Sequence, residues 1–248
     1  MIVRVGHLYP EYLNIYADRG NIAVFTRRAA ARGHELRVDA VTLETPLAPG
    51  SHDLVYVGGG QDREQAMIAP DLAARGEAIR AAVAGGTALL AVCGGYQLLG
   101  RGYRGRDGSW LEGAGLFPHE TVAGETRMIG DVLLESALDE APGRTIAGFE
   151  NHAGRTVLDP GAEPLGRVVA GYGNDGASGF EGCRYRRAYG TYLHGPLLPR
   201  NPWFADRLLE EALAHAGVEE RFEPLPDELE REAHAVSAAR ARSRGGRT

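Results

Sequence analysis

Two short apolar runs that each end in glycines constrain the fold of this chain most. Residues 53–57 run directly into Gly58-Gly59-Gly60, and residues 87–92 run into Cys93-Gly94-Gly95. Each run has the length and apolar character of a strand that is buried on both faces, and each precedes a segment with helical spacing. Buried strands that alternate with helices are typical of a parallel, doubly wound sheet. The chain is therefore predicted to be an α/β protein.

The first 105 residues continue this alternation. Further strands are predicted at residues 2–8 and 35–41, and helices at residues 21–32 and 66–84, the second with a break near Pro70. Beyond residue 105 shorter runs are separated by glycine and proline, which predicts a more mixed or antiparallel half that returns to the sheet near residues 189–193. Asn201-Pro202 then begins a last helix, with Asn201 as the N-cap, that ends near Ala216.

Length and composition fit one soluble domain followed by a tail. The 248 residues are 44% hydrophobic and carry a net charge of -6, which does not favour binding to nucleic acid or to an anionic membrane. Residues 1–223 are expected to form the domain. Residues 224–248 are charged and poor in large apolar side chains, so they are expected to be a disordered tail, with residues 238–248 disordered or weakly helical. The N-terminus lacks signal-peptide features and the sequence lacks a long apolar run, so a cytoplasmic location is expected.

Cys93 lies where a predicted strand gives way to a helix. Small residues surround it in Val92-Cys93-Gly94-Gly95, as the tight turn of a nucleophile elbow requires. The helix N-terminus would place N–H groups beside the sulfur, which favours the thiolate, and the N–H of Gly94 would be one oxyanion donor. A cysteine at a strand end can also be a small buried hydrophobe. The turn by itself therefore leaves both interpretations open.

A second glycine turn and a histidine complete the predicted thiol site. Sites in open α/β sheets form beyond the carboxyl ends of the strands, where Gly60 can present a second N–H to the same oxyanion. A cysteine nucleophile needs a base, and His194, at the end of a late strand, is the best candidate, with His152 as the alternative. The other six histidines are expected at the surface or in loops, Cys183 is expected to be structural, and no cluster has metal-ligand spacing.

Several motifs together resemble the class I, triad-type glutamine amidotransferases, and more narrowly the cobyric-acid-synthase-like branch. Within that branch they are similar to the glutaminase subunits (GatD type) of lipid II isoglutaminyl synthase. The resemblance covers about residues 2–216. The segments that carry it are Leu8-Tyr9-Pro10, Asn14-Ile15-Tyr16, Asp18-Arg19-Gly20-Asn21, residues 58–65 (GGGQDREQ), Cys93-Gly94-Gly95-Tyr96-Gln97, Phe149-Glu150-Asn151-His152 and residues 192–196 (YLHGP).

The resemblance implies a fold and a set of site residues. The fold is a flavodoxin-like three-layer sandwich with a mostly parallel central sheet. Cys93 would be the nucleophile and His194 the base. Arg127 would bind the α-carboxylate of L-glutamine, for which a guanidinium is well suited, and Gln97 would help to position the substrate. Gly60 and Gly94 would form the oxyanion hole.

The resemblance also implies a partner. Ammonia from glutamine would pass to a Mur-ligase-like, ATP-dependent subunit (MurT type) in a heterodimeric complex, which amidates the D-glutamate α-carboxylate of lipid II to D-isoglutamine in peptidoglycan synthesis. ATP and Mg²⁺ would belong to that subunit, and no metal or organic cofactor is expected in this chain. The complex would lie in the cytoplasm, at the inner face of the membrane through its lipid II substrate.

Pro196 departs from the wider pattern. Most class I amidotransferases have glutamate two residues after the catalytic histidine, whereas the cobyric-acid-synthase-like branch shares the absence seen here. Either a Cys93–His194 dyad is sufficient or the partner supplies the orienting carboxylate. Two alternative functions stay open: a glutaminase for another amidating ligase, such as a corrinoid amidase, and a non-catalytic scaffold subunit.

Overall fold

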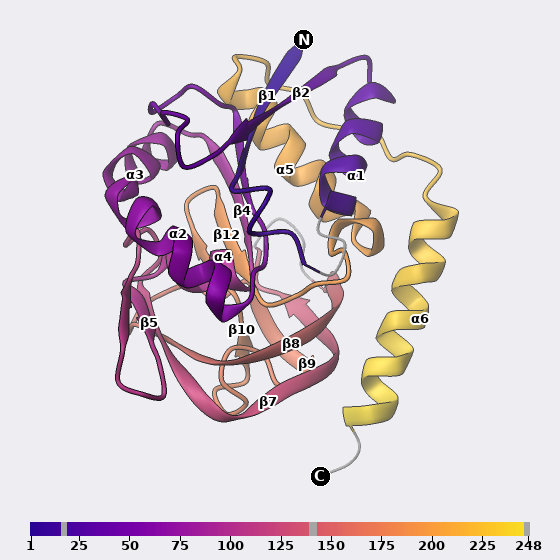
Figure 1. The fold of residues 1–248 in the computed structure, drawn as a ribbon. Coiled ribbons are helices and arrows are strands. Elements are labelled where there is room, and N and C mark those ends of the chain that lie inside the picture. The colour runs from indigo at the N-terminus through magenta and orange to yellow at the C-terminus, as the bar shows by residue number, and fades with distance from the viewer. Residues whose placement is uncertain (16–18, 139–142, 246–248) are drawn as a thin grey trace.

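A six-stranded sheet forms the centre of the computed structural model, which describes residues 1–15, 19–138 and 143–245 (Figure 1). Its strand order is β11-β12-β4-β3-β1-β2, and the five strands from β12 to β2 are parallel while β11 is antiparallel. The order of these five parallel strands is that of the flavodoxin-like folds. The bounds are β1 Ile2–Leu8, β2 Glu35–Val41, β3 Leu54–Val57, β4 Ala88–Val92, β11 Cys183–Tyr185 and β12 Ala188–Thr191.

Helices cover both faces of this sheet. Figure 1 shows α1 and α5 on one side and α2 and α3 on the other, and α4 continues directly from β4. Because both faces are covered, every residue of β3, β4 and β12 is buried. The predicted three-layer α/β fold is thereby confirmed. The bounds are α1 Arg19–Ala30, α2 Asp62–Ala74, α3 Gly76–Ala84, α4 Gly94–Leu99 and α5 Pro202–His215, with a 3-10 turn at Leu198–Arg200.

The break between α2 and α3 lies at Arg75, and the prediction of a break at Pro70 is wrong. Pro70 is inside α2, whereas Arg75 is the residue between the end of α2 and the start of α3. The guanidinium of Arg75 donates to the carbonyl oxygens of Thr42, Leu43 and Thr45, which anchors this point to the loop after β2. These distant contacts decide where the helix turns.

The second half of the chain forms a mixed sheet, as predicted. Its order is β10-β9-β7-β5-β6, and β8 pairs with β7 in a long antiparallel hairpin. A register shift between Ala123 and Met128 interrupts this hairpin, and Arg127 lies in the interruption. The bounds are β5 Gly102–Arg104, β6 Trp110–Glu112, β7 His119–Ser136, β8 Thr145–Leu158, β9 Gly166–Ala170 and β10 Phe180–Glu181.

The C-terminal segment is helical where disorder was expected. Helix α6 spans Glu228–Gly245 and packs on β7, β8 and β9 through Ala238 and Ala241, which contact a small apolar cluster of the sheet. A ring nitrogen of His234 lies 2.8 Å from the hydroxyl of Thr145. A contact face of alanines and one histidine adds little hydrophobicity to the sequence, so composition alone pointed to a tail.

Asn201 and two histidines also differ from expectation. Asn201 precedes α5, but its side chain makes no cap hydrogen bond; it pairs instead with the backbone N–H and C=O of Ala147 in β8. His7 and His119 are buried in strands β1 and β7 rather than exposed or in loops. None of the helices in the described part of the chain is long and apolar enough to cross a membrane.

Candidate active site

Cys93 occupies a strained turn between β4 and α4. Its backbone has φ 47° and ψ -103°, a conformation that residues other than glycine rarely adopt. The turn closes against the neighbouring glycine loop, because a Cβ atom on Gly95 would lie 2.8 Å from the carbonyl oxygen of Gly58. These are the geometry and the small neighbours that a nucleophile elbow requires.

Gly60 and Gly94 come together at this turn. A Cβ atom on Gly94 would lie 2.9 Å from the backbone nitrogen of Gly60, so the two backbones are in close approach. Gly94 is the first residue of α4, whose first N–H groups have no partner within the helix. Two backbone N–H groups brought together at such a turn are the kind of donors that an oxyanion hole needs.

A cavity of about 610 Å³ opens over Cys93. Of the predicted site residues, Gly60, Gln97 and Arg127 line it together with Cys93, and so does His152. The cavity lies between the carboxyl ends of the parallel strands and the β7–β8 hairpin, which therefore forms its second wall. Its volume is suitable for an amino acid.

Arg127 is held at the cavity by the opposite strand of the hairpin. Its Nε donates to Oδ1 of Asn151, and one Nη donates to the carbonyl oxygen of Asn151, both at 3.0 Å. The guanidinium has five N–H groups, so three remain for a ligand. An exposed arginine that is braced in this way can bind a carboxylate with two parallel hydrogen bonds.

Gln97 lies on a buried polar wall of the cavity. Its Nε2 donates to the hydroxyl of Tyr192 at 3.1 Å, and that hydroxyl lies 2.6 Å from the hydroxyl of Thr156. The ring of Tyr192 stacks on His152 with the centroids 3.5 Å apart. Burial raises the pKa of Tyr192, so its hydroxyl stays protonated and the wall is neutral.

His194 follows β12, the strand next to β4. Thr191 pairs with Val92 in parallel register, so His194 and Cys93 leave adjacent strands at the same edge of the sheet. The backbone of His194 is bonded to Phe149 in β8, and the residue is fully buried, outside the set that lines the cavity. The sequence therefore places the base candidate on the correct edge, while the imidazole that lines the cavity is that of His152.

His152 has a fixed orientation. Its Nδ1 donates to the carbonyl oxygen of Gly154 at 2.8 Å, since a carbonyl can only accept. Its Nε2 lies 3.5 Å from the carboxylate of Glu150, which accepts the backbone N–H groups of Tyr172 and Gly173. Burial lowers the pKa of His152 in spite of this carboxylate, which keeps the ring neutral.

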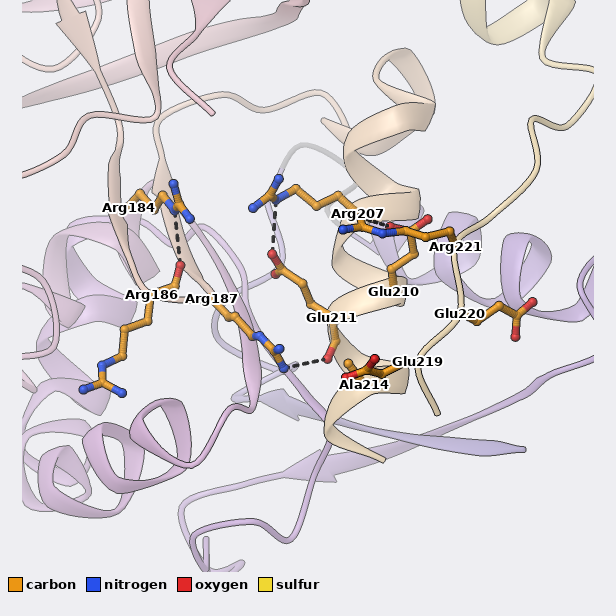
Figure 2. A pocket seen from close by; sticks show the side chains of 10 residues that line it. All are labelled: Arg184, Arg186, Arg187, Arg207, Glu210, Glu211, Ala214, Glu219, Glu220 and Arg221. Atoms are coloured by element: carbon orange, nitrogen blue, oxygen red, sulfur yellow. Dashed lines mark hydrogen bonds and ion pairs between the residues drawn. The ribbon is translucent and has the colours of Figure 1, made fainter. Parts of the chain in front are cut away.

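A second cavity, of about 630 Å³, lies beside α5 and contains none of the predicted site residues. Figure 2 shows its walls of arginines and glutamates, in which Arg207 pairs with Glu211 and Arg221 pairs with Glu210. Five arginines and four glutamates line it, so most of its charges compensate one another. No group of histidine, cysteine or carboxylate side chains suited to a metal ion occurs among the residues that the structure describes.

A family model decides the relationship of this chain to known proteins. The model of the CobB/CobQ-like glutamine amidotransferase domain matches residues 4–202. The chain belongs to this family.

Relatives extend the match beyond the family domain. The lipid II isoglutaminyl synthase (glutamine-hydrolyzing) subunit GatD of Staphylococcus aureus is 39% identical over 239 residues, which cover 96% of this chain and 95% of the relative. The same subunit of Streptococcus pneumoniae is 40% identical over 213 residues, covering 85% and 80%. The cobyric acid synthase of Pelotomaculum thermopropionicum is 37% identical over 158 residues, but these cover 59% of this chain and 30% of that relative.

Solved structures agree on the fold. The structure of PurLQS from Thermotoga maritima matches with a TM-score of 0.59 at 15% identity and covers 87% of this chain and 100% of that one. A glutamine amidotransferase from the same organism matches with a TM-score of 0.53 at 20% identity and covers 97% and 95%. At these identities the similarity concerns the fold alone.

The family motif around Gly20 and Asn21 supports the loop that follows His194. A Cβ atom on Gly20 would lie 2.5 Å from Cγ of Pro196, so only glycine fits there. Oδ1 of Asn21 accepts the backbone N–H of Leu198, and its Nδ2 donates to the hydroxyl of Tyr56. Pro196, where most class I enzymes have glutamate, therefore packs against this motif. Tyr16 and Asp18 of the same motif lie outside the described residues.

Two neighbours of the site were not singled out from the sequence. Asn151 braces Arg127, and its place in Phe149-Glu150-Asn151-His152 was the available signal. Gln65 contacts Gly60 through its side chain, and its place at the end of the GGGQDREQ segment was the signal. The roles of both depend on contacts between segments that are distant in sequence or separated by a turn.

Proposed function

We propose that the chain is the glutaminase subunit of a lipid II isoglutaminyl synthase, which hydrolyses L-glutamine and delivers the ammonia to an amidating partner subunit. The observation that carries this proposal is Cys93 in a strained elbow, opening onto a cavity that is lined on its other wall by Arg127. A thiol nucleophile, two oxyanion donors and a carboxylate-binding arginine are the groups that glutamine hydrolysis requires.

The reaction begins with Arg127 binding the α-carboxylate of glutamine, while Gln97 positions the rest of the substrate. Cys93 gives its thiol proton to His194, its sulfur attacks the side-chain amide carbon, and the N–H groups of Gly60 and Gly94 stabilise the oxyanion that forms. The C–N bond then breaks, the nitrogen takes a proton from His194, and ammonia leaves. A water molecule, deprotonated by His194, hydrolyses the thioester to glutamate and restores the thiol.

His194 is favoured over His152 as the base for a geometric reason. His194 and Cys93 come from adjacent parallel strands, as nucleophile and base do in α/β enzymes. His152 has Nδ1 engaged by Gly154 and its ring face covered by Tyr192. We therefore expect His194→Asn to abolish ammonia release and His152→Asn to retain a measurable rate. The opposite ranking would assign the base to His152.

The second half of the reaction belongs to a partner subunit. Amidation of a carboxylate requires its activation, for which ATP is the usual source. The sequence of this chain contains no lysine, and so it lacks the lysine of a P-loop. We infer that a Mur-ligase-like, ATP- and Mg²⁺-dependent subunit activates the α-carboxylate of D-glutamate in lipid II. The reaction would then take place in the cytoplasm, at the inner face of the membrane.

A glutaminase serving a corrinoid amidase is the alternative. The similarity to cobyric acid synthases covers little more than half of this chain, whereas the similarity to the lipid II subunits extends over nearly all of it. That difference favours the cell-wall substrate.

The decisive experiment replaces Cys93 by serine and measures amidation of lipid II by the complex. With glutamine as nitrogen donor the variant should be inactive, because the thiol is lost. With ammonium chloride it should amidate at the wild-type rate, because the partner receives ammonia directly. Cys183→Ala is the matched control, since Cys183 is a buried cysteine away from the cavity, and should keep glutamine-dependent activity. Glutamine-dependent activity in Cys93→Ser would refute the proposal.

A further inference from the structure

The three carbonyl groups of the turn Gly58-Gly59-Gly60 are held by three different segments. Gly58 accepts the N–H of Gly95 at 3.1 Å, and Gly59 accepts the N–H of Ile15 at 3.3 Å. Gly60 accepts Nε2–H of Gln65, also at 3.1 Å. Two of these anchors are backbone groups, so Gln65 is the one anchor of the three that a substitution can remove.

These anchors determine where the Gly60 N–H points. A peptide unit is planar and trans, so the bond to the Gly59 carbonyl directs the Gly60 N–H to the opposite side. The bond from Gln65 to the Gly60 carbonyl fixes the next peptide unit in the same way. Gly60 is thus held between two fixed planes. Glycine has no side chain to restrict its rotation, so without such bonds its N–H direction would be poorly defined.

The side chain of Gln65 lies within the site rather than beside it. It is 4% exposed and lines the same cavity as Cys93. A Cβ atom on Gly94 would lie 3.1 Å from both Cδ and Nε2 of Gln65, so the amide packs against the first residue after the nucleophile. Gln65 therefore touches both glycines whose N–H groups would form the oxyanion hole.

The hydrogen bonds of Gln65 argue against a purely stabilising role. A carbonyl can only accept, so the amide atom that contacts Gly60 is the nitrogen of Gln65. The amide oxygen, Oε1, is buried and has no hydrogen-bond partner among the described residues. A buried acceptor that lacks a donor destabilises the fold. An apolar side chain of the same length would fill this space without that cost. What glutamine adds is the N–H donor to Gly60.

We propose that Gln65 is a positioning residue for the oxyanion hole. Its Nε2–H holds the carbonyl of Gly60 and thereby keeps the Gly60 N–H directed at the oxyanion formed when Cys93 attacks the substrate. This inference rests on the proposed glutaminase function. It extends the site by a residue that acts through the backbone of Gly60 and not on the substrate itself.

Two variants remove the donor while preserving size. Gln65→Met keeps the length of the side chain without an N–H group, and Gln65→Glu places a second acceptor against the carbonyl of Gly60. Both are measured in the complex with the partner subunit. Met67→Ala, at an exposed position of the same helix, is the control and should behave as the wild type. Three quantities are compared: steady-state glutamine hydrolysis, inhibition by glutarate semialdehyde and alkylation of Cys93 by iodoacetamide.

Each quantity tests a different part of the site. The aldehyde forms a tetrahedral adduct with Cys93 whose oxygen occupies the oxyanion hole, and it has no α-amino group with which to cyclise. Alkylation by iodoacetamide depends on the thiol alone. We expect kcat to fall about tenfold or more, with KM changed less than about threefold, because an oxyanion donor acts in the transition state. The inhibition constant of the aldehyde should rise by the same factor as kcat/KM falls, and alkylation should stay within about twofold of the wild type.

Two results would overturn the proposal. The first result is that both variants keep kcat within about threefold of the wild type, which would mean that the Gly60 N–H needs no anchor from Gln65. In the other, iodoacetamide alkylation falls in parallel with kcat, so that Gln65 supports the elbow as a whole. Failure of the underlying function is distinguishable from both, because the wild-type complex would then release no ammonia from glutamine.

Discussion

Glu181 should make the stability of this protein depend on pH. The carboxylate is fully buried at the end of the second sheet, where it accepts the backbone N–H of Tyr192 at 2.6 Å and the hydroxyl of Thr191 at 3.1 Å. Burial is the main cause that raises its pKa from 4.5 to about 8, against the lowering effect of these two hydrogen bonds. The group is thus protonated in the folded protein at neutral pH.

The sign of the effect follows from the two states. Between pH 4.5 and about 8 the unfolded chain releases the proton of Glu181 while the folded chain keeps it. Because the unfolded state binds fewer protons, the free energy of unfolding falls as pH rises, by about 1.4 kcal/mol for each pH unit. Stabilisation is fully present below pH 4.5 and is lost by the time the pH passes 8. Between pH 5.5 and 7.5 the titration of Glu181 lowers the free energy of unfolding by about 2.5 kcal/mol.

The substitution Glu181→Gln removes this titration and preserves the shape of the side chain. In Glu181→Gln the amide oxygen can accept the N–H of Tyr192, and the amide nitrogen can donate to the hydroxyl of Thr191, which rotates to accept. Urea unfolding, followed by tryptophan fluorescence at pH 5.5 and 7.5, measures the difference. The wild type should lose about 2.5 kcal/mol more than the variant between these two values.

This test has a control variant and one outcome that would contradict the prediction. Glu232 is exposed on α6, so Glu232→Gln should show the same pH dependence as the wild type. If Glu181→Gln lost as much stability as the wild type between pH 5.5 and 7.5, Glu181 would be ionised in the folded state and the reasoning would be refuted.

Three further predictions follow from the same structure. Arg127→Lys should lower kcat/KM for glutamine by about tenfold or more, because lysine cannot brace itself on Asn151 and still present a planar fork; an unchanged value would exclude Arg127 from substrate binding. Arg28→Met should lower the free energy of unfolding by about 3 kcal/mol, because it removes the ion pair of Asp227 and leaves Asp206 with Arg32 alone; unaltered urea denaturation would contradict this. If the partner supplies the orienting carboxylate, glutamine turnover should increase when the partner is added; equal turnover would favour the dyad.

Most of the central sheet could be predicted from local sequence patterns. Strands β3 and β4 are continuous apolar runs that end in glycines, so their burial and direction could be predicted from period and turn residues alone. The elbow at Cys93 was predictable for the same reason, because a tight strand-to-helix turn needs small residues in adjacent positions. By contrast, the break at Arg75 depends on carbonyl groups about 30 residues earlier in the chain, which no local pattern reveals.

The site could be predicted in part. Cys93 and Gln97 are four residues apart at the start of one helix, so their proximity is local, and Gly60 follows the neighbouring strand. Arg127 reaches the same cavity only because an interrupted hairpin folds over the sheet and Asn151 holds it there. That wall consists of antiparallel strands whose register is set by distant pairings, and the sequence outside the family motifs contains no signal for it.

The sequence by itself determined the α/β class, the alternation of strands and helices in the first half, the strained turn at Cys93 and, through its motifs, the family. These depend on neighbours within a few residues or on a pattern that repeats along one strand. Only the tertiary structure decided that His152 lines the cavity, that residues 228–245 dock as a helix and that Gln65 holds the carbonyl of Gly60. Each of these depends on which surfaces become buried together, and burial is a property of the folded chain rather than of any segment in it.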